Sequence, residues 1–137
     1  MPVKIIAEVG VNHNCCLKRA LRMIDVAANA GVDVVKFQAY RSEFLASRHA
    51  SKAQYQKTNT DSSETQLQML QKLELPREYF PILLKHCLKR NVEFLVTPFD
   101  LDSLNYLVHD LKLNCLKVPS GEITNAPFLL DCARSGL

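Results

Sequence analysis

Short apolar runs that alternate with helical segments are the feature that most constrains how this chain can fold. The runs are rich in β-branched or aromatic residues, which is typical of buried strands, and they span residues 3–9, 32–40, 93–99 and 115–119. Apolar residues at helical spacing predict helices over residues 17–28, 67–73, 76–88, 101–111 and 126–135. The order predicts an α/β fold with parallel strands, because each crossover is long enough to bring the chain back to the same edge of a sheet.

Four strand–helix units leave two architectures open. They can form a small open sheet, or they can form the first four units of a (β/α)8 barrel of the TIM type, which needs about 250 residues. The chain has 137 residues, enough for one domain with a core of its own. In the second case, residues 1–137 are the N-terminal half of a barrel domain, and the chain is a truncated half-barrel.

Composition narrows the classes of function. The formal net charge is +3, and the basic residues are spread along the chain without interleaved aromatic residues, so nucleic-acid binding is not expected. No apolar run approaches the ~18 residues of a membrane span, and no leader sequence precedes the first predicted strand. The five cysteines form no CxxC motif and no zinc-finger spacing, which favours reduced thiols. We therefore expect a cytoplasmic protein that binds neither nucleic acid nor membrane.

Each predicted strand carries a polar residue near its carboxyl end. Because side chains alternate along a strand, Glu8, Lys36, Thr97 and Lys117 each stand among apolar neighbours. Burying them separately would cost roughly several kcal/mol each, whereas at one edge of a sheet they could satisfy one another and a ligand. That edge is where α/β sheets and barrels bind substrates. A single strand lysine is explained equally well by pairing with a nearby glutamate, but the recurrence on four strands favours a site.

The residue types at this edge suit an anion such as phosphate or carboxylate. The lysines supply charge, and the hydroxyl groups of Thr97 and Ser120 supply hydrogen-bond donors. Pro119 ends the fourth predicted strand, so Ser120 is expected to begin a loop whose backbone amides face the anion. Glu8 and Glu122 could act as acid or base, or could hold sugar hydroxyl groups.

Several sequence words also resemble a known family. They are IAEVGVNHN at residues 6–14, VKFQ at 35–38, TPFD at 97–100 and KVPSGE at 117–122. In order and spacing, the chain closely resembles the N-terminal part of the barrel domain of the N-acetylneuraminate (sialic acid) synthase family, which includes legionaminic acid synthases. Each word alone is weak, but together they are highly specific, and the resemblance spans essentially the whole chain.

The resemblance implies a transferase with a (β/α)8 barrel. Such an enzyme condenses phosphoenolpyruvate with an N-acylated hexosamine, such as N-acetylmannosamine, to a nine-carbon 2-keto sugar acid and phosphate. The positions implied for phosphoenolpyruvate are Lys36, Thr97, Lys117 and Ser120. The positions implied for the amino sugar or the reacting centre are Glu8, Gln38, Asn59 and Glu122. Among these, the two glutamates are the expected catalytic residues.

The resemblance further implies a divalent metal ion, Mn²⁺ or Mg²⁺, whose ligands lie beyond residue 137, and a homodimer for the full-length protein. The chain alone is therefore expected to be inactive. The family usually has glycine after the Asn-His-Asn turn, where this chain has Cys15 and Cys16, so strain is expected in that turn. Two other functions remain open: a Schiff-base aldolase that uses Lys36 or Lys117 as nucleophile, and a non-catalytic truncated gene product.

Overall fold

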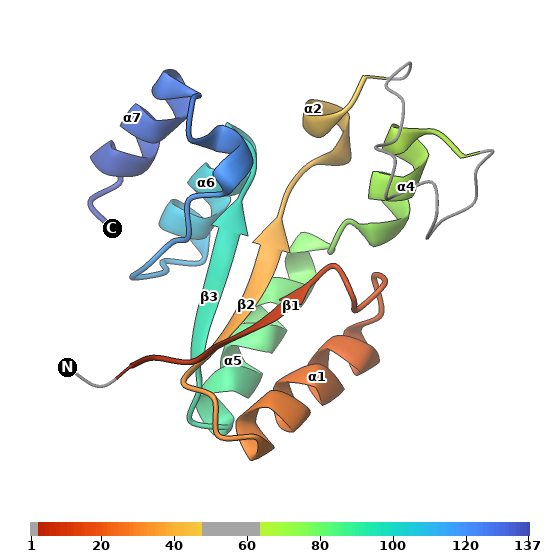
Figure 1. The fold of residues 1–137 in the computed structure, drawn as a ribbon, viewed down its shortest axis with the longest axis vertical. Coiled ribbons are helices and arrows are strands. Elements are labelled where there is room, and N and C mark those ends of the chain that lie inside the picture. Colours follow the sequence, from red (N-terminus) through yellow and green to blue (C-terminus); the bar gives the residue numbers. More distant parts are fainter. Residues whose placement is uncertain (1–2, 48–63) are drawn as a thin grey trace.

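Three parallel strands form the centre of the molecule. The computed structural model describes residues 3–47 and 64–137. Within them, β1 (Ile6–Gly10), β2 (Val34–Ala39) and β3 (Glu93–Pro98) pair in the order β1-β2-β3. All three carboxyl ends point the same way (Figure 1). The predicted α/β fold with a parallel sheet is confirmed.

Helices surround this sheet in two groups. Helices α1 (Leu17–Asn29) and α5 (Phe80–Lys89) lie side by side against one face of the sheet (Figure 1). Helices α2 (Ser42–Leu45) and α4 (Gln66–Leu73) lie beyond the carboxyl end of β2, whereas α6 (Leu101–Asn105) lies beside β3 and contacts α7 (Ala126–Arg134) (Figure 1). Helix α6 continues into a wider π-type turn at Tyr106–Asp110, and single 3₁₀ turns occupy Arg77–Tyr79 and Ser120–Glu122.

The core lies between the sheet and the pair α1 and α5. Val35 and Phe37 of β2 are completely buried there, and they pack with Ile24 of α1 and Leu83 of α5. Each such side chain contributes about 1.5–3 kcal/mol by its removal from water. Because strand side chains alternate, this packing fixes which strand residues face away from the helices. Those residues include the polar ones that the sequence singles out.

The prediction of a fourth strand at residues 115–119 is wrong. Residues 115–119 run beside β3, but they make only one isolated bridge, between Leu116 and Val96, with a hydrogen bond from Lys117 N to Val96 O of 3.1 Å. Pro119 has no N–H group to extend the ladder, and none of the described strands pairs with the other side of this segment. The sheet therefore has three strands, with a fourth segment tethered to its edge.

The turn after β1 adopts the left-handed backbone that glycine adopts without cost. Asn14 has φ 46° and Cys15 has φ 56°, as expected from the missing glycine. The turn is held by the backbone N–H of Cys15, which donates to Nδ1 of His13 over 3.0 Å. His13 is buried and its ring stacks on Phe37, with ring centroids 6.2 Å apart. The turn is thus anchored in the core.

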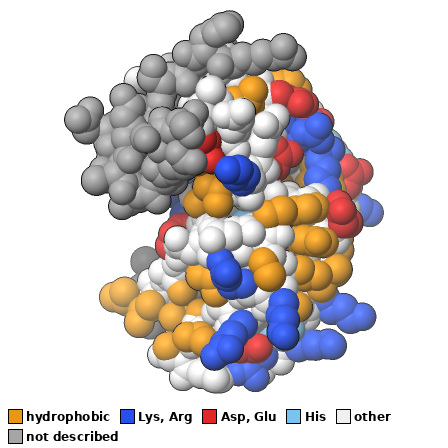
Figure 2. Space-filling model, turned by 90° about the vertical axis from the view of Figure 1, so that its right-hand side faces the viewer, with side chains coloured by type: hydrophobic (Ala, Val, Ile, Leu, Met, Phe, Trp, Pro, Cys, Tyr) orange, Lys and Arg blue, Asp and Glu red, His pale blue; other side chains and the backbone are white. Residues whose placement is uncertain are grey.

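On the face drawn in Figure 2, lysine and arginine side chains lie among apolar ones, and they predominate over acidic side chains in the lower half of the view. None of the described helices has the length and apolar character needed to cross a membrane.

Candidate functional site

The candidate site lies at the carboxyl ends of the strands, on the face opposite α1 and α5. Glu8 of β1 and Lys36 of β2 are partners in the parallel register, and the Glu8 carboxylate forms an ion pair with the Lys36 ammonium group. The Lys36 side chain is largely buried, with 17% of its surface exposed, whereas the Glu8 side chain is 43% exposed. A buried cation therefore meets a carboxylate that is open to solvent.

The pKa of Lys36 is lower than that of an ordinary lysine. Burial lowers the pKa of Lys36, and the positive charge of Lys117 lowers it further. Its ion pair with Glu8 favours the charged form and works against this shift. Two lysines that repel each other beside a single carboxylate leave an excess positive charge, which an anionic ligand would relieve.

The next rung of the sheet pairs Gln38 of β2 with Thr97 of β3. Thr97 is buried, and its Oγ1 atom has no hydrogen-bond partner among the described residues. A buried hydroxyl group without a partner costs roughly 1–3 kcal/mol, so it marks a place where a ligand atom can be accepted. Because Gln38 and Lys36 share one face of β2, Thr97 lies on the same side as the ion pair.

Gly10 is a site residue that the sequence arguments missed. Its φ is +54°, and a Cβ at this position would lie 3.0 Å from Oε1 of Glu8 and 3.4 Å from Nε2 of Gln38. The bare backbone of Gly10 thus leaves room for the Glu8 and Gln38 side chains to approach each other. The only signal in the sequence is that Gly10 closes the first apolar run.

The remaining predicted site residues are Lys117, Ser120, Glu122 and Asn59. Lys117 is exposed and acts on Lys36 through its charge. Ser120 is exposed at the start of the 3₁₀ turn, and Glu122 at its end accepts a hydrogen bond of 2.6 Å from Nδ2 of Asn125. The structure thus brings Glu8, Lys36, Gln38 and Thr97 together with Lys117 nearby, but it shows no contact from Ser120 or Glu122 to them. Asn59 lies outside the described residues.

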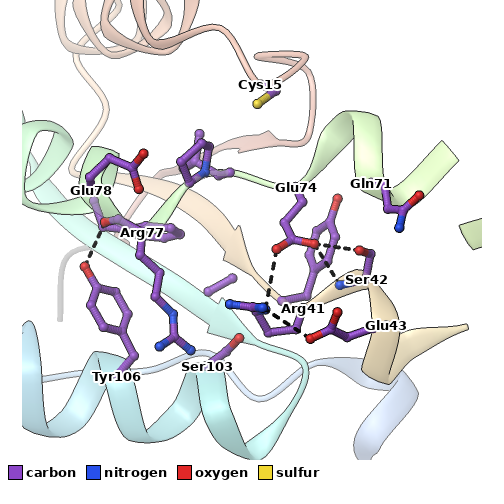
Figure 3. A pocket seen from close by; sticks show the side chains of 15 residues that line it. Cys15, Arg41, Ser42, Glu43, Gln71, Glu74, Arg77, Glu78, Ser103 and Tyr106 are labelled. Carbon is purple, nitrogen blue, oxygen red and sulfur yellow. Dashed lines mark hydrogen bonds and ion pairs between the residues drawn. The ribbon is translucent and has the colours of Figure 1, made fainter. Parts of the chain in front are cut away.

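A cavity of about 740 Å³ lies elsewhere, between the end of β2, α4, the start of α5 and α6 (Figure 3). Arg41 in its wall pairs with Glu43 over 3.2 Å and with Glu74 over 3.7 Å, and Ser42 Oγ donates to Glu74 over 2.7 Å. These charges satisfy one another, and none of the predicted site residues that the structure describes lines the cavity. The cavity therefore offers a ligand less excess charge than the strand ends do.

Metal binding finds no support in the described part of the chain. No three His, Cys, Asp or Glu side chains of residues 3–47 and 64–137 come together in a group that could hold a metal ion. These residues alone do not fit a metal centre.

Comparison with known proteins gives a consistent result. The model of the NeuB family matches residues 23–137. The chain is 48% identical to N,N'-diacetyllegionaminic acid synthase of Campylobacter jejuni, over 95% of this chain and 39% of that protein. It is 32% identical to human N-acetylneuraminate-9-phosphate synthase, over 98% of this chain and 37% of that protein. The chain thus spans less than two-fifths of the length of these curated relatives.

A solved structure shows the same fold. The N-acetylneuraminic acid (sialic acid) synthetase of Leptospira borgpetersenii, crystallised with citrate, superposes with a TM-score of 0.84 and 36% identity. The match covers 100% of this chain and 43% of that one. The three-stranded sheet and its helices are therefore similar to one part of a larger synthetase.

Proposed function

The chain belongs to the NeuB family, and on this premise we propose that it carries the phosphoenolpyruvate-binding side of a sugar acid synthase. The proposed enzyme is a transferase that condenses phosphoenolpyruvate with an N-acylated hexosamine, N-acetylmannosamine or a related sugar. The products are a nine-carbon 2-keto sugar acid and phosphate. In this proposal the residues described above are the first units of a (β/α)8 barrel, and residues 1–137 form its N-terminal half.

One observation carries the proposal. Lys36 and Lys117 lie near enough for their charges to interact, and a buried Thr97 hydroxyl group without a partner faces the same side of the sheet. Phosphoenolpyruvate carries both a phosphate and a carboxylate group, so it supplies the negative charge and the acceptor oxygens that this arrangement lacks. Ser120 is proposed to add a fourth contact, from the turn that follows Lys117.

The proposed reaction uses the remaining residues at the second substrate. Carbon 3 of phosphoenolpyruvate attacks the aldehyde carbon of the open-chain sugar, and the aldehyde oxygen takes up a proton. Water adds at carbon 2, and the tetrahedral intermediate loses phosphate as its C–O bond breaks. Glu8 and Glu122 are proposed as acid or base in these proton transfers, and Gln38 and Asn59 as groups that hold the amino sugar.

Three further elements of the proposal rest on the resemblance to the family. They are a divalent metal ion, Mn²⁺ or Mg²⁺, a homodimer and a cytoplasmic location. The described residues form no group of three metal ligands, so residues outside them would hold the metal ion.

Titration calorimetry tests the proposal. Phosphoenolpyruvate, inorganic phosphate and pyruvate are titrated separately into the 137-residue chain and into the protein at the full length that its gene encodes. We expect phosphoenolpyruvate to bind more tightly than pyruvate does, and phosphate release in the presence of the amino sugar only from a protein that also contains the remaining units of the barrel. Failure of both proteins to bind phosphoenolpyruvate contradicts the proposal. Full turnover by the 137-residue chain contradicts the part of the proposal in which this chain supplies only the phosphoenolpyruvate-binding side.

A Schiff-base aldolase is a second candidate, favoured by one observation. Lysines that form imines need a lowered pKa, and burial and Lys117 lower the pKa of Lys36. Borohydride reduction in the presence of pyruvate separates the two functions, because an imine at Lys36 or Lys117 would be trapped and seen by mass spectrometry. The synthase reaction forms no imine, so we expect no labelling of either lysine.

A further inference from the structure

The strongest unassigned feature is a buried carboxylate just beyond the strand ends. Asp100 is 8% exposed, and its two oxygens accept three hydrogen bonds. Oδ1 accepts from Ser103 N over 2.7 Å, while Oδ2 accepts from Arg41 N over 2.8 Å and from Ser103 Oγ over 2.9 Å. Neither the proposed reaction nor the candidate site uses this carboxylate.

Asp100 continues the ladder between two strands after the strands themselves have ended. The last paired residues are Ala39 and Pro98, and Phe99 N still donates to Ala39 O over 3.0 Å. At the next rung, the Arg41 N–H donates to the Asp100 side chain in place of a backbone carbonyl. This substitution lets the chain separate into α2 and α6, which leave the ends of β2 and β3 in different directions (Figure 1), while the strand ends stay joined.

The joined ends carry residues of the candidate site. Gln38 and Thr97 are paired in the register directly before Ala39 and Pro98. Lys36 precedes Gln38 on the same face of β2. A change in the spacing of the two strand ends would first move the Gln38 amide relative to the Thr97 hydroxyl group. The Asp100 carboxylate touches neither of them, so it can act on them only through the backbone.

We propose that Asp100 is a positioning residue: its buried carboxylate joins the end of β2 to the start of α6, and thereby fixes the separation of Gln38 and Thr97 across the binding edge for phosphoenolpyruvate and the amino sugar. This inference rests on the proposed function. A simple helix cap would need only the bond to Ser103 N, which aspartate, asparagine or serine can supply. The bond to Arg41 N requires a second acceptor oxygen, which is the feature that distinguishes the two roles.

Two substitutions separate capping from strand joining. In Asp100→Asn the amide oxygen can still cap α6, but the amide nitrogen is a donor and cannot accept from Arg41 N. Asp100→Ser also keeps a capping oxygen, but its shorter side chain has no second oxygen for Arg41. Ile24→Val, in the core on α1, serves as a control for a general loss of stability without a change at the strand ends.

The test measures phosphoenolpyruvate affinity by calorimetry and the separate KM and kcat values for both substrates, in the protein at the full length that its gene encodes. We expect both Asp100 variants to bind phosphoenolpyruvate roughly fivefold to twentyfold more weakly and to show a raised KM for the amino sugar, at a melting temperature like that of Ile24→Val. Hydrogen exchange at the Arg41 amide should become faster in both, which shows that the bond has been lost.

Each outcome decides a different point. Affinity and KM values within twofold of the unsubstituted protein, with a fast-exchanging Arg41 amide, overturn the positioning role. The same loss of affinity in Ile24→Val overturns it as well, because the effect would then follow stability alone. An unsubstituted protein that binds no phosphoenolpyruvate overturns the proposed function, and the inference falls with it.

Discussion

Glu8 and Lys36 stand opposite each other on neighbouring parallel strands, and their side chains form the only ion pair that joins β1 to β2 among the described residues. The pair lies on the face that the helices leave open. Lys36 has a second cation nearby, Lys117, whose charge lowers the pKa of Lys36. The balance of charge at this edge therefore depends strongly on Glu8.

Replacement of Glu8 by glutamine should separate binding from turnover. Glu8→Gln removes the one negative charge beside two lysines, so phosphoenolpyruvate should bind a few-fold more tightly at low ionic strength. Turnover in the full-length protein should fall by about 10²-fold or more, because an acid–base group is lost. Calorimetry and a phosphate-release assay measure the two effects. Weaker binding by Glu8→Gln would show that Glu8 does not compete with the anion for Lys36.

The two lysines should differ in their importance for anion binding. Lys117→Ala removes one charge-assisted contact, worth about 1.5–3 kcal/mol, so affinity for phosphoenolpyruvate should fall by roughly one to two decades. Lys36→Ala should cost at least as much, because it also leaves Glu8 without its partner and facing the anion. Lys85→Ala, on the exposed side of α5, is the matched control. If the affinity for phosphoenolpyruvate is unchanged in both Lys36→Ala and Lys117→Ala, the assignment of the anion site is contradicted.

Much of this arrangement could be predicted from the sequence because it depends on local patterns. Apolar runs at residues 3–9, 32–40 and 93–99 bury one face against helices, so alternation alone places Glu8, Lys36 and Thr97 on the other face. The run at 115–119 has the same local pattern but is not a strand. A strand needs partners in the sheet, and that segment has only Val96 on one side within the described residues.

The features that escaped prediction depend on distant contacts. Arg41 and Asp100 are 59 positions apart in sequence, so their hydrogen bond has no signature in either segment. Gly10 is read from the sequence as the end of a strand, whereas its contribution is the space it leaves beside Glu8 and Gln38. Both effects become visible only when the strands are paired in their register.

Stability should decrease as the pH falls below the usual pKa of histidine. Burial lowers the pKa of His13, so the folded chain takes up this proton at a lower pH than the unfolded chain, which takes it up near the usual value of about 6.5. Below that pH the unfolded state binds more protons, and the free energy of unfolding falls by up to about 1.4 kcal/mol per pH unit. Protonation of Nδ1 would also break the hydrogen bond from Cys15 N.

Urea unfolding between about pH 7.5 and 5.5 measures this dependence. His13→Gln should flatten the slope, although it lowers stability at every pH, because glutamine does not titrate. His109→Gln, at an exposed position, should leave the slope unchanged. Equal slopes for all three proteins would show that His13 is not the group responsible.

An apolar groove beside β1 should make the isolated chain associate. The groove, of about 400 Å³, lies between β1 and α1 and is lined largely by apolar side chains, among them Val9, Met23 and Val26. The other side of β1 pairs with β2, so this edge of the sheet is open among the described elements. We expect residues 1–137 alone to bind a hydrophobic dye and to sediment as more than a monomer.

The position of the dye can be tested with two exposed apolar residues. Val26→Lys places a charge in the groove and should reduce both dye fluorescence and association. Leu88→Lys changes a residue on α5 that is similarly exposed but does not line the groove, and it should have little effect. A monomer that binds no dye would contradict the expectation of an open edge.

The space beside Gly10 should matter for the site as well as for the backbone. Gly10 and Gly31 both have positive φ, +54° and +81°, so alanine at either position should cost about 1–2 kcal/mol of stability through backbone strain. A Cβ at Gly31 would meet nothing within 4 Å, whereas at Gly10 it would lie 3.0 Å from the Glu8 carboxylate that pairs with Lys36. Only Gly10→Ala should therefore disturb the ion pair.

Parallel measurements on Gly10→Ala and Gly31→Ala isolate this effect. Urea unfolding should show similar losses of stability for the two variants, because the backbone strain is common to both. Calorimetry should show affinity for the amino sugar unchanged in Gly31→Ala and lower by about fivefold in Gly10→Ala, because the Glu8 and Gln38 side chains must move to admit the new methyl group. Equal affinities would mean that these side chains shift without altering the amino-sugar site, and Gly10 would then serve the backbone alone.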